Sequence, residues 1–157
     1  MTLADPFRRL FSHFPTGVAV ITGVGQQGPV GMTTNALCSL SLEPLLLLVC
    51  FDQGARTLPV VRVSGRFGVN LLRADQGDLS RVFASKLPQR EKFADARYRI
   101  HDGVPLLAGT LGWLTCDLRE THPGGDHTIG IGEVREMGGP ADGDPLVWYG
   151  GDYRGIT

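Results

Sequence analysis

An Asp-His pair stands directly after two glycines in the second half of the sequence, and these residue types could bind a ligand or carry protons. Gly124-Gly125 allows a sharp backbone turn before Asp126-His127. The run 129–134 then alternates apolar residues with glycine, which is typical of a strand that a flat or bulky group approaches closely. The pattern places Asp126 and His127 at the mouth of a sheet, where the imidazole either orients a ligand or only caps the turn.

A second polar cluster lies far upstream, within residues 31–44. Four short side chains that donate or accept hydrogen bonds fall on one expected strand: Thr33, Thr34, Asn35 and Ser39. Small polar groups on a rigid strand suit the edge of a heterocycle. Ordinary cross-strand pairing of threonines is the alternative interpretation.

A third candidate is the segment Asp52–Thr57, which follows the apolar run Leu45–Phe51 and opens a predicted helix. The start of a helix offers free backbone N–H groups and the positive end of its dipole to an anion. Arg56 and Thr57 would complete a phosphate cradle there. In the alternative interpretation, Thr57 only caps the helix and Arg56 is solvated.

Strands dominate the elements that would position these groups. We expect an amphipathic N-terminal helix that presents four apolar side chains on one face and stops at Pro15, and two further helices over 57–63 and 78–87. The patterns predict strands over 18–22, 30–41, 45–51, 67–72, 111–119, 128–136 and 146–149. Such strands, with helices only between them and at the start, can close a barrel.

The sequence resembles the short-chain flavin reductases, the reductase components of two-component flavin-dependent monooxygenases. The matching segments run nearly end to end in the family's order: 14–18, 31–44, 65–70, 91–93, 125–134 and 145–154. The resemblance implies a mostly β fold with flanking helices, namely the FMN-binding split β-barrel with Greek-key-like connections. It covers residues 1–157 as a single domain.

The resemblance also implies which residues meet the cofactors. It places the flavin against Thr33, Thr34, Asn35, Ala36, Ser39, Cys50, Asp52, Ala55, Arg56, Thr57, Lys92 and Phe93. It places the nicotinamide against His127 and Tyr153. Segment 86–91 is charged, so a solvated face is the alternative for Lys92. Gln53-Gly54-Ala55 stands where the family has more hydroxyl groups, and main-chain contacts would substitute there.

The activity that the resemblance implies is an NAD(P)H-dependent flavin reductase. Hydride passes from nicotinamide C4 to the N5 atom of FMN or FAD, which requires no catalytic acid or base, and the reduced flavin diffuses to a partner monooxygenase. Members of the family are generally homodimers. One alternative is a non-catalytic split barrel that binds flavin or another planar ligand such as haem. A hydrolase built on Ser39, Asp126 and His127 is a weaker alternative, because no G-x-S-x-G motif is present.

Length and composition limit the remaining possibilities. The 157 residues, of which 42% are hydrophobic, fit one domain with one core. A net charge of −1 without a basic run argues against nucleic acid as a partner. The N-terminus lacks the apolar segment of a signal peptide and the longest apolar run is too short to span a bilayer, so we expect a cytoplasmic protein. Cys38, Cys50 and Cys116 show no metal-binding spacing, and we expect no metal site.

Overall fold

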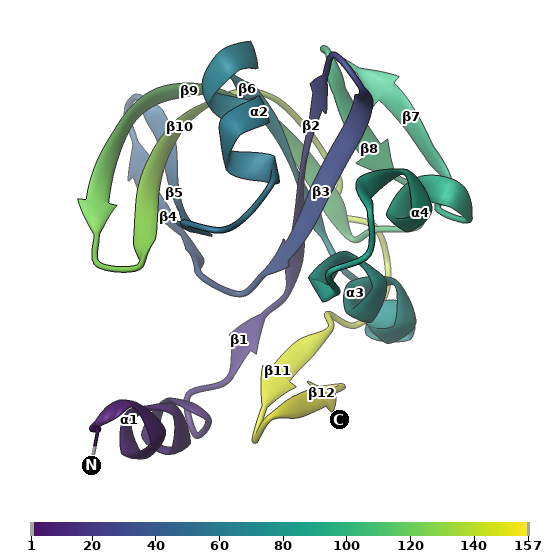
Figure 1. The fold of residues 1–157 in the computed structure, drawn as a ribbon. Helices are drawn as coiled ribbons and strands as arrows, with labels where there is room; N and C mark the ends of the chain where they lie inside the picture. The colour runs from purple at the N-terminus through teal and green to yellow at the C-terminus, as the bar shows by residue number, and fades with distance from the viewer. Residues whose placement is uncertain (1, 157) are drawn as a thin grey trace.

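A seven-stranded antiparallel sheet forms the body of the molecule in this computed structural model, which describes residues 2–156. Its order is β3 (Gly28–Thr34), β2 (Ala19–Gly25), β6 (Arg66–Leu71), β9 (Gly112–Gly124), β10 (His127–Gly138), β5 (Leu45–Asp52) and β4 (Leu37–Leu42). The sheet curls into an open barrel (Figure 1). Its two edge strands, β3 and β4, are consecutive in the sequence, so the short segment Asn35–Ala36 bridges the split.

The prediction of a single strand over 30–41 is wrong, because the chain bends sharply at Asn35–Ala36. The Ala36 N–H donates to Thr34 Oγ1 at 3.0 Å, which closes a local turn. The Cys50 N–H donates to the Ala36 carbonyl at 2.9 Å and ties this turn to β5. A short side-chain bond thus redirects a strand-like sequence from one edge of the barrel to the other.

Three helices and a hairpin surround the barrel (Figure 1). The predicted helices at 57–63 and 78–87 are confirmed as α2 (Thr57–Ser64) and α3 (Gly77–Ala84). A short 3-10 turn, η1 (Ala74–Gln76), precedes α3. The sequence patterns missed α4 (Gln89–Ala94) and the hairpin of β7 (Tyr98–His101) and β8 (Val104–Leu107). Both α3 and α4 pack against β3.

The two ends of the chain meet in a second, small sheet beneath the barrel. Its strand order is β1 (Thr16–Gly17), β11 (Val147–Tyr149) and β12 (Asp152–Arg154). The N-terminal helix α1 (Ala4–Phe11) precedes it and ends at Phe11 rather than at Pro15 as predicted. Two backbone bonds continue the turn beyond the helix, from His13 to Leu10 and from Phe14 to Phe11. Among residues 2–156, no helix is long and apolar enough to cross a membrane.

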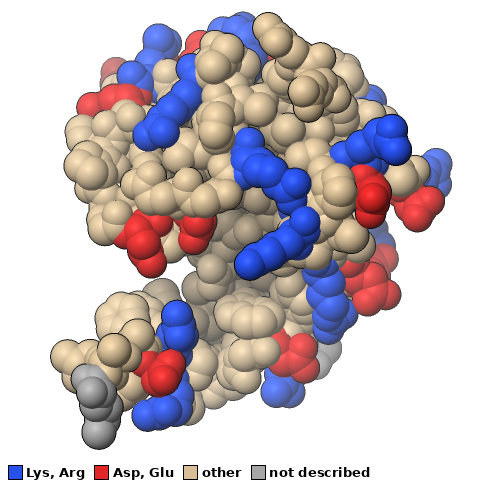
Figure 2. All heavy atoms as spheres, viewed as in Figure 1, with Lys and Arg blue, Asp and Glu red and all other residues tan. Residues whose placement is uncertain are grey.

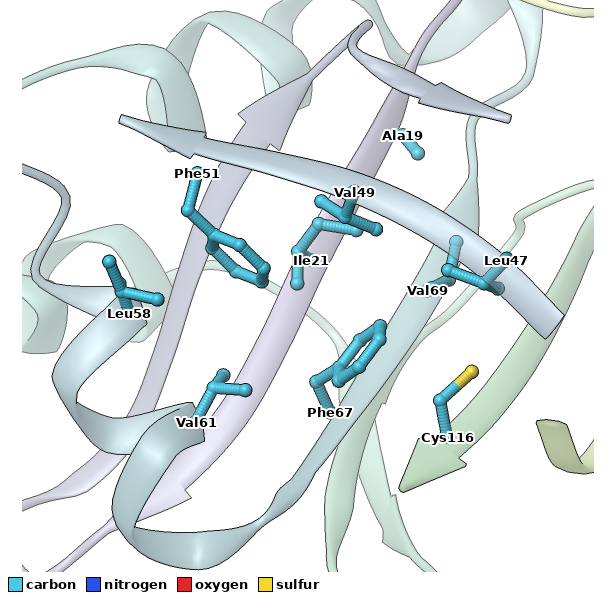
Figure 3. Packing of buried hydrophobic residues seen from close by; sticks show 10 residues of the cluster. All are labelled: Ala19, Ile21, Leu47, Val49, Phe51, Leu58, Val61, Phe67, Val69 and Cys116. Atoms are coloured by element: carbon cyan, nitrogen blue, oxygen red, sulfur yellow. The ribbon is translucent and has the colours of Figure 1, made fainter. Parts of the chain in front are cut away.

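The barrel core forms where the inner faces of β2, β5, β6 and β9 meet α2 (Figure 3). Phe51 and Phe67 are fully buried, and their rings cross edge to face with centroids 6.3 Å apart. Gly130 lies so close to the Phe51 ring that an added Cβ would stand 2.9 Å from it, and Gly132 faces Phe67 even more closely. The predicted close approach to β10 is thus confirmed, and the flat groups are core aromatic rings.

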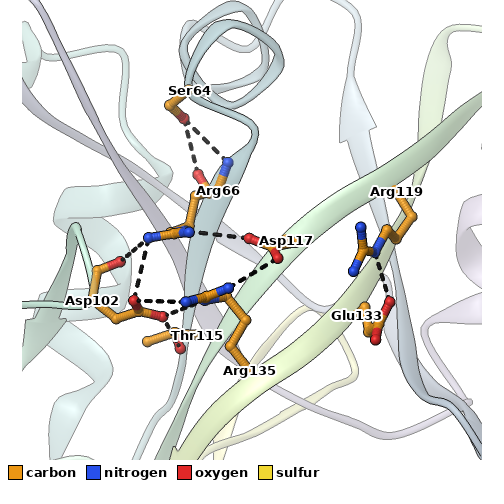
Figure 4. Close-up of polar contacts among 8 residues, drawn as sticks. All are labelled: Ser64, Arg66, Asp102, Thr115, Asp117, Arg119, Glu133 and Arg135. Carbon is orange, nitrogen blue, oxygen red and sulfur yellow. Dashed lines mark hydrogen bonds and ion pairs between the residues drawn. The ribbon is translucent and has the colours of Figure 1, made fainter.

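A charged network fastens the β7–β8 hairpin to the barrel (Figure 4). Asp102, in the hairpin turn, accepts bonds from Arg135 at 2.7 Å, from Thr115 at 2.9 Å and from Arg66 at 3.2 Å. Asp117 on β9 accepts from the same two arginines. The bond from Arg135 and the other contacts hold the pKa of Asp102 below its usual range. The hairpin tip is therefore bound to β6, β9 and β10 as one ionic cluster.

Candidate active site

Three segments that are far apart in the sequence meet at one rim of the barrel. His127 at the start of β10 pairs with Asp52 at the end of β5, across the antiparallel ladder. The Gln53 N–H donates to the Asp126 carbonyl at 3.0 Å, and Gln53 Nε2 donates to the His127 carbonyl at 3.2 Å. The turn at Ala36 joins the same rim through Cys50. Gln53 was not among the predicted site residues, although its place directly after the apolar strand β5 was a signal.

The Asp126-His127 pair forms a hydrogen bond of its own at this rim. His127 Nδ1 lies 2.7 Å from Asp126 Oδ1, and this bond lowers the pKa of the Asp126 carboxyl. An ionised carboxylate only accepts, so Nδ1 carries the proton and the Nε2 atom of a neutral ring is an acceptor. Within residues 2–156, no hydrogen bond involves Nε2. The pair can therefore present an oriented acceptor to a ligand.

The start of α2 lies next along the rim and departs from the predicted cap. Arg56 is the N-cap residue, whereas Thr57 is the first helical residue and is fully buried. Among the described residues, Thr57 Oγ1 has no hydrogen-bond partner. A buried hydroxyl without a partner is unfavourable unless a ligand or water satisfies it. The interpretation of Thr57 as a simple cap is therefore wrong.

Arg56 is also not merely solvated. Its Nη2 atom donates to the carbonyls of Lys86 at 2.9 Å and Leu87 at 2.8 Å. These bonds hold the loop between α3 and α4 beside the start of α2. Asp52 stabilises the intervening loop, since its carboxylate accepts the Gly54 N–H at 2.7 Å.

Lys92 brings a second positive charge to this corner. It is only 5% exposed, and its Nζ donates to the Phe83 carbonyl at 3.0 Å, so the solvated alternative is wrong. Burial, and then the positive charge of Arg56, lower the pKa of Lys92. Among residues 2–156, neither cation has a carboxylate within ion-pair distance. Two cations without a counter-charge, beside a buried hydroxyl and a helix start, make a site for an anion.

A groove of about 900 Å³ reaches the rim at Asn35, Ala36 and Cys50, whereas Arg56, Thr57 and Lys92 are not among the residues that line it. Asn35, Ala36, Ser39 and Cys50 are among its lining residues, and most of the others are apolar side chains from segment 14–19 and from β4, β5, β9 and β10. Burial raises the pKa of the Cys50 thiol, which keeps it neutral. Figure 2 shows a hollow in the face between the barrel and the lower part of the molecule, with Lys and Arg side chains gathered beside it. The groove can take a planar ring, and the charged corner at the start of α2 can take an anion.

Three other predicted site residues make contacts within the fold. Thr33 turns toward α3 and donates to the Ser80 carbonyl at 2.6 Å, and Phe93 packs on Phe83 in the second core cluster. Ser39 pairs with Leu47, five positions along β5 from Asp52, the partner of His127. At about 3.3 Å per residue, the partner of Ser39 and the partner of His127 lie roughly 16 Å apart along β5. The three residues of the hydrolase alternative are thus not assembled.

The chain also matches a known protein family. Residues 11–157 match the family described as flavin reductase like domain. The chain belongs to this family. The predicted family and the mostly β, split-barrel fold are both confirmed.

Similar proteins are flavin reductases by name. The reductase subunit HsaB of a flavin-dependent monooxygenase from Mycobacterium tuberculosis is 40% identical over 157 residues, covering 97% of this chain and 83% of that protein. The FMN reductase (NADH) SmoA from Agrobacterium fabrum is 38% identical over 148 residues, covering 94% and 83%. The NADH:FAD oxidoreductase SgcE6 from Streptomyces globisporus, solved in complex with NAD and FAD fragments, superposes with a TM-score of 0.92 at 33% identity, covering 100% and 96%.

Proposed function

We propose that this member of the flavin reductase family transfers hydride from NADH or NADPH to FMN or FAD and supplies the reduced flavin to a separate monooxygenase. The observation that carries the proposal is the convergence of Arg56, Lys92 and the unpartnered Thr57 hydroxyl at the start of α2, on the rim that an apolar groove reaches at Cys50. The names of the similar proteins support both cofactors and the two-component arrangement.

The residues at the rim fit a flavin. A phosphate at the start of α2 would satisfy Thr57 Oγ1 and balance the charges of Arg56 and Lys92. The turn at Asn35–Ala36 and the end of β5 at Cys50–Asp52 would border the ring, with Ala55 beside its phosphate-bearing chain. When bound, the flavin supplies the hydride-accepting centre. The backbone N–H groups of the rim would offset negative charge on the ring edge.

His127 would orient the nicotinamide. With Nδ1 held by Asp126, its Nε2 can accept a hydrogen bond from the carboxamide N–H of the dinucleotide. This contact positions the ring for transfer and moves no proton. Tyr153, the second residue expected at the nicotinamide, has its hydroxyl bonded to Ser80 on α3.

The test is the oxidation of NADH and of NADPH by the purified protein, followed by the absorbance of the reduced nicotinamide without oxygen and with FMN, FAD or riboflavin added. We expect rapid oxidation that depends on flavin. Flavin binding without oxidation of either dinucleotide would favour the non-catalytic alternative. Absence of flavin binding at levels well above micromolar would remove the proposal altogether.

We also propose that the protein is a homodimer. Large apolar side chains surround the groove and remain exposed: Leu42 at 86%, Met137 at 57%, Leu40 at 47% and Leu45 at 39%. No side chain of α1 is buried within the chain, and its aromatic residues are also exposed. A second copy that covered these surfaces would remove their apolar side chains from water. A monomer mass by light scattering over a wide concentration range would contradict this.

We place this activity in the cytoplasm. Cys38, Cys50 and Cys116 are all free thiols in the structure, as is typical of proteins in a reducing compartment. Fractionation of cells that express the full-length protein would test the proposal.

A further inference from the structure

A buried contact joins the C-terminal hairpin to helix α3. The hydroxyl of Tyr153 on β12 and Oγ of Ser80 are hydrogen-bonded at 2.7 Å, and Ser80 is fully buried. The Tyr153 ring is fixed on two sides, by the Trp148 ring with centroids 5.1 Å apart and by the Arg81 guanidinium 4.9 Å from its centroid. Asp152 lies 3.6 Å from that guanidinium and completes the clamp. The hydroxyl of Tyr153 therefore has one well-defined place.

The same serine holds the strand that leads into the rim of the candidate site. The Ser80 carbonyl accepts the Thr33 hydroxyl at 2.6 Å. Thr34 follows directly, and its Oγ1 accepts the N–H of Ala36, whose carbonyl accepts the Cys50 N–H. A continuous series of hydrogen bonds and one peptide link thus leads from Tyr153 to the turn that bridges the split of the barrel.

We propose that Tyr153 is a positioning residue for the flavin, acting through Ser80 and Thr33 on the turn at Asn35–Ala36. The inference rests on the proposed flavin site. A phenol ring held by Trp148 and Arg81 anchors α3 at Ser80, and the Ser80 carbonyl in turn fixes Thr33 near the end of β3. Because β3 is an edge strand, only β2 pairs with it, and the bond from the Thr33 side chain to α3 adds a further restraint at this end of the strand. Loss of the anchor lets the turn shift relative to β5, where the ring edge would lie.

The test uses Tyr153→Phe and Ser80→Ala, each of which removes one hydroxyl and keeps the packing. We expect each variant to raise the Kd for FMN about fivefold, the size of one lost intramolecular hydrogen bond, with kcat at saturating flavin and the KM for NADH within about twofold of the parent. The double variant should be no weaker than either single one, because the two groups form one bond. Tyr149→Phe is the matched control, since Tyr149 lies in the same hairpin and is 41% exposed.

The readouts separate this role from two others. A higher KM for NADH with unchanged FMN affinity in Tyr153→Phe would overturn the inference and make Tyr153 a nicotinamide contact. A lower melting temperature with unchanged FMN affinity in both variants would overturn it in favour of a purely structural role. If the parent protein binds FMN and the variants bind it equally well, the proposed function stands and this inference is wrong. If the parent itself binds no flavin, the proposed function fails first.

Discussion

Replacing Lys92 with methionine tests the anion site most directly. The ammonium is 5% exposed and uses one of its three donors on the Phe83 carbonyl, which leaves two for a phosphate. Hydrogen bonds to charged groups contribute about 1.5–3 kcal/mol, so Lys92→Met should weaken FMN binding by about 10- to 150-fold. Riboflavin lacks the phosphate, so its affinity for Lys92→Met should stay within about twofold of its affinity for the parent protein.

The pH dependence gives a second readout of the same group. Because burial lowers the pKa of Lys92 below 10.5, we expect FMN affinity to fall on the alkaline side before an ordinary lysine would titrate. The free energy of unfolding without ligand changes with pH in the opposite direction. The unfolded chain holds this proton more tightly than the folded one, so the contribution of Lys92 to the free energy of unfolding increases as pH rises through its lowered pKa toward 10.5. Both effects should disappear in Lys92→Met.

The assay is titration of flavin fluorescence with FMN and with riboflavin from pH 7 to 10. Lys86→Met is the control, because the side chain of Lys86 is exposed and only its carbonyl is held by Arg56. We expect it to change FMN affinity less than about threefold. Equal weakening of FMN and riboflavin by Lys92→Met would refute a phosphate contact, and unchanged FMN binding would place the anion elsewhere.

Three further predictions concern the nicotinamide contact, the core and the alkaline limit of stability. His127→Asn should lower kcat/KM for the reduced dinucleotide by about 10-fold at saturating flavin and leave flavin affinity unchanged, whereas unchanged kcat/KM would remove His127 from the site. Gly132→Ala forces a methyl group against the Phe67 ring and should lower stability by about 1–3 kcal/mol in urea unfolding, while Gly155→Ala, with open space around it, should be neutral. Burial raises the pKa of the Cys116 thiol from 9.0 to about 12, so the free energy of unfolding should fall by up to about 1.4 kcal/mol per pH unit between these values as the unfolded thiol ionises. Cys116→Ala should show a correspondingly shallower alkaline decline, and an identical pH profile would contradict the assignment.

The sequence alone determined most strands, two of the helices near the site and the position of its key residues along the chain. These features are local. The alternation at 129–134 predicts β10, the apolar run Leu45–Phe51 predicts β5, and a helix start after it predicts the place of Arg56. The resemblance to flavin reductases added the fold and the activity, because it depends on the order of short segments over the whole chain.

Only the tertiary structure decided which of these residues meet. The pairing of His127 with Asp52 joins positions that are far apart in sequence, and no local pattern contains it. The break at Asn35–Ala36 was missed because threonine and asparagine fit a strand as well as a turn, and a single bond from Ala36 to Thr34 selects the turn.

The burial of Lys92 was decided in the same way. Residues 86–91 are charged and predict a solvated loop, yet α4 packs on β3, where the Gly31 N–H donates to the Gln89 side chain. The periodicity of a six-residue helix is too short to show which face is buried. Whether a lysine is solvated or enclosed depends on the surface that its helix meets, and that surface is formed by segments distant in the sequence.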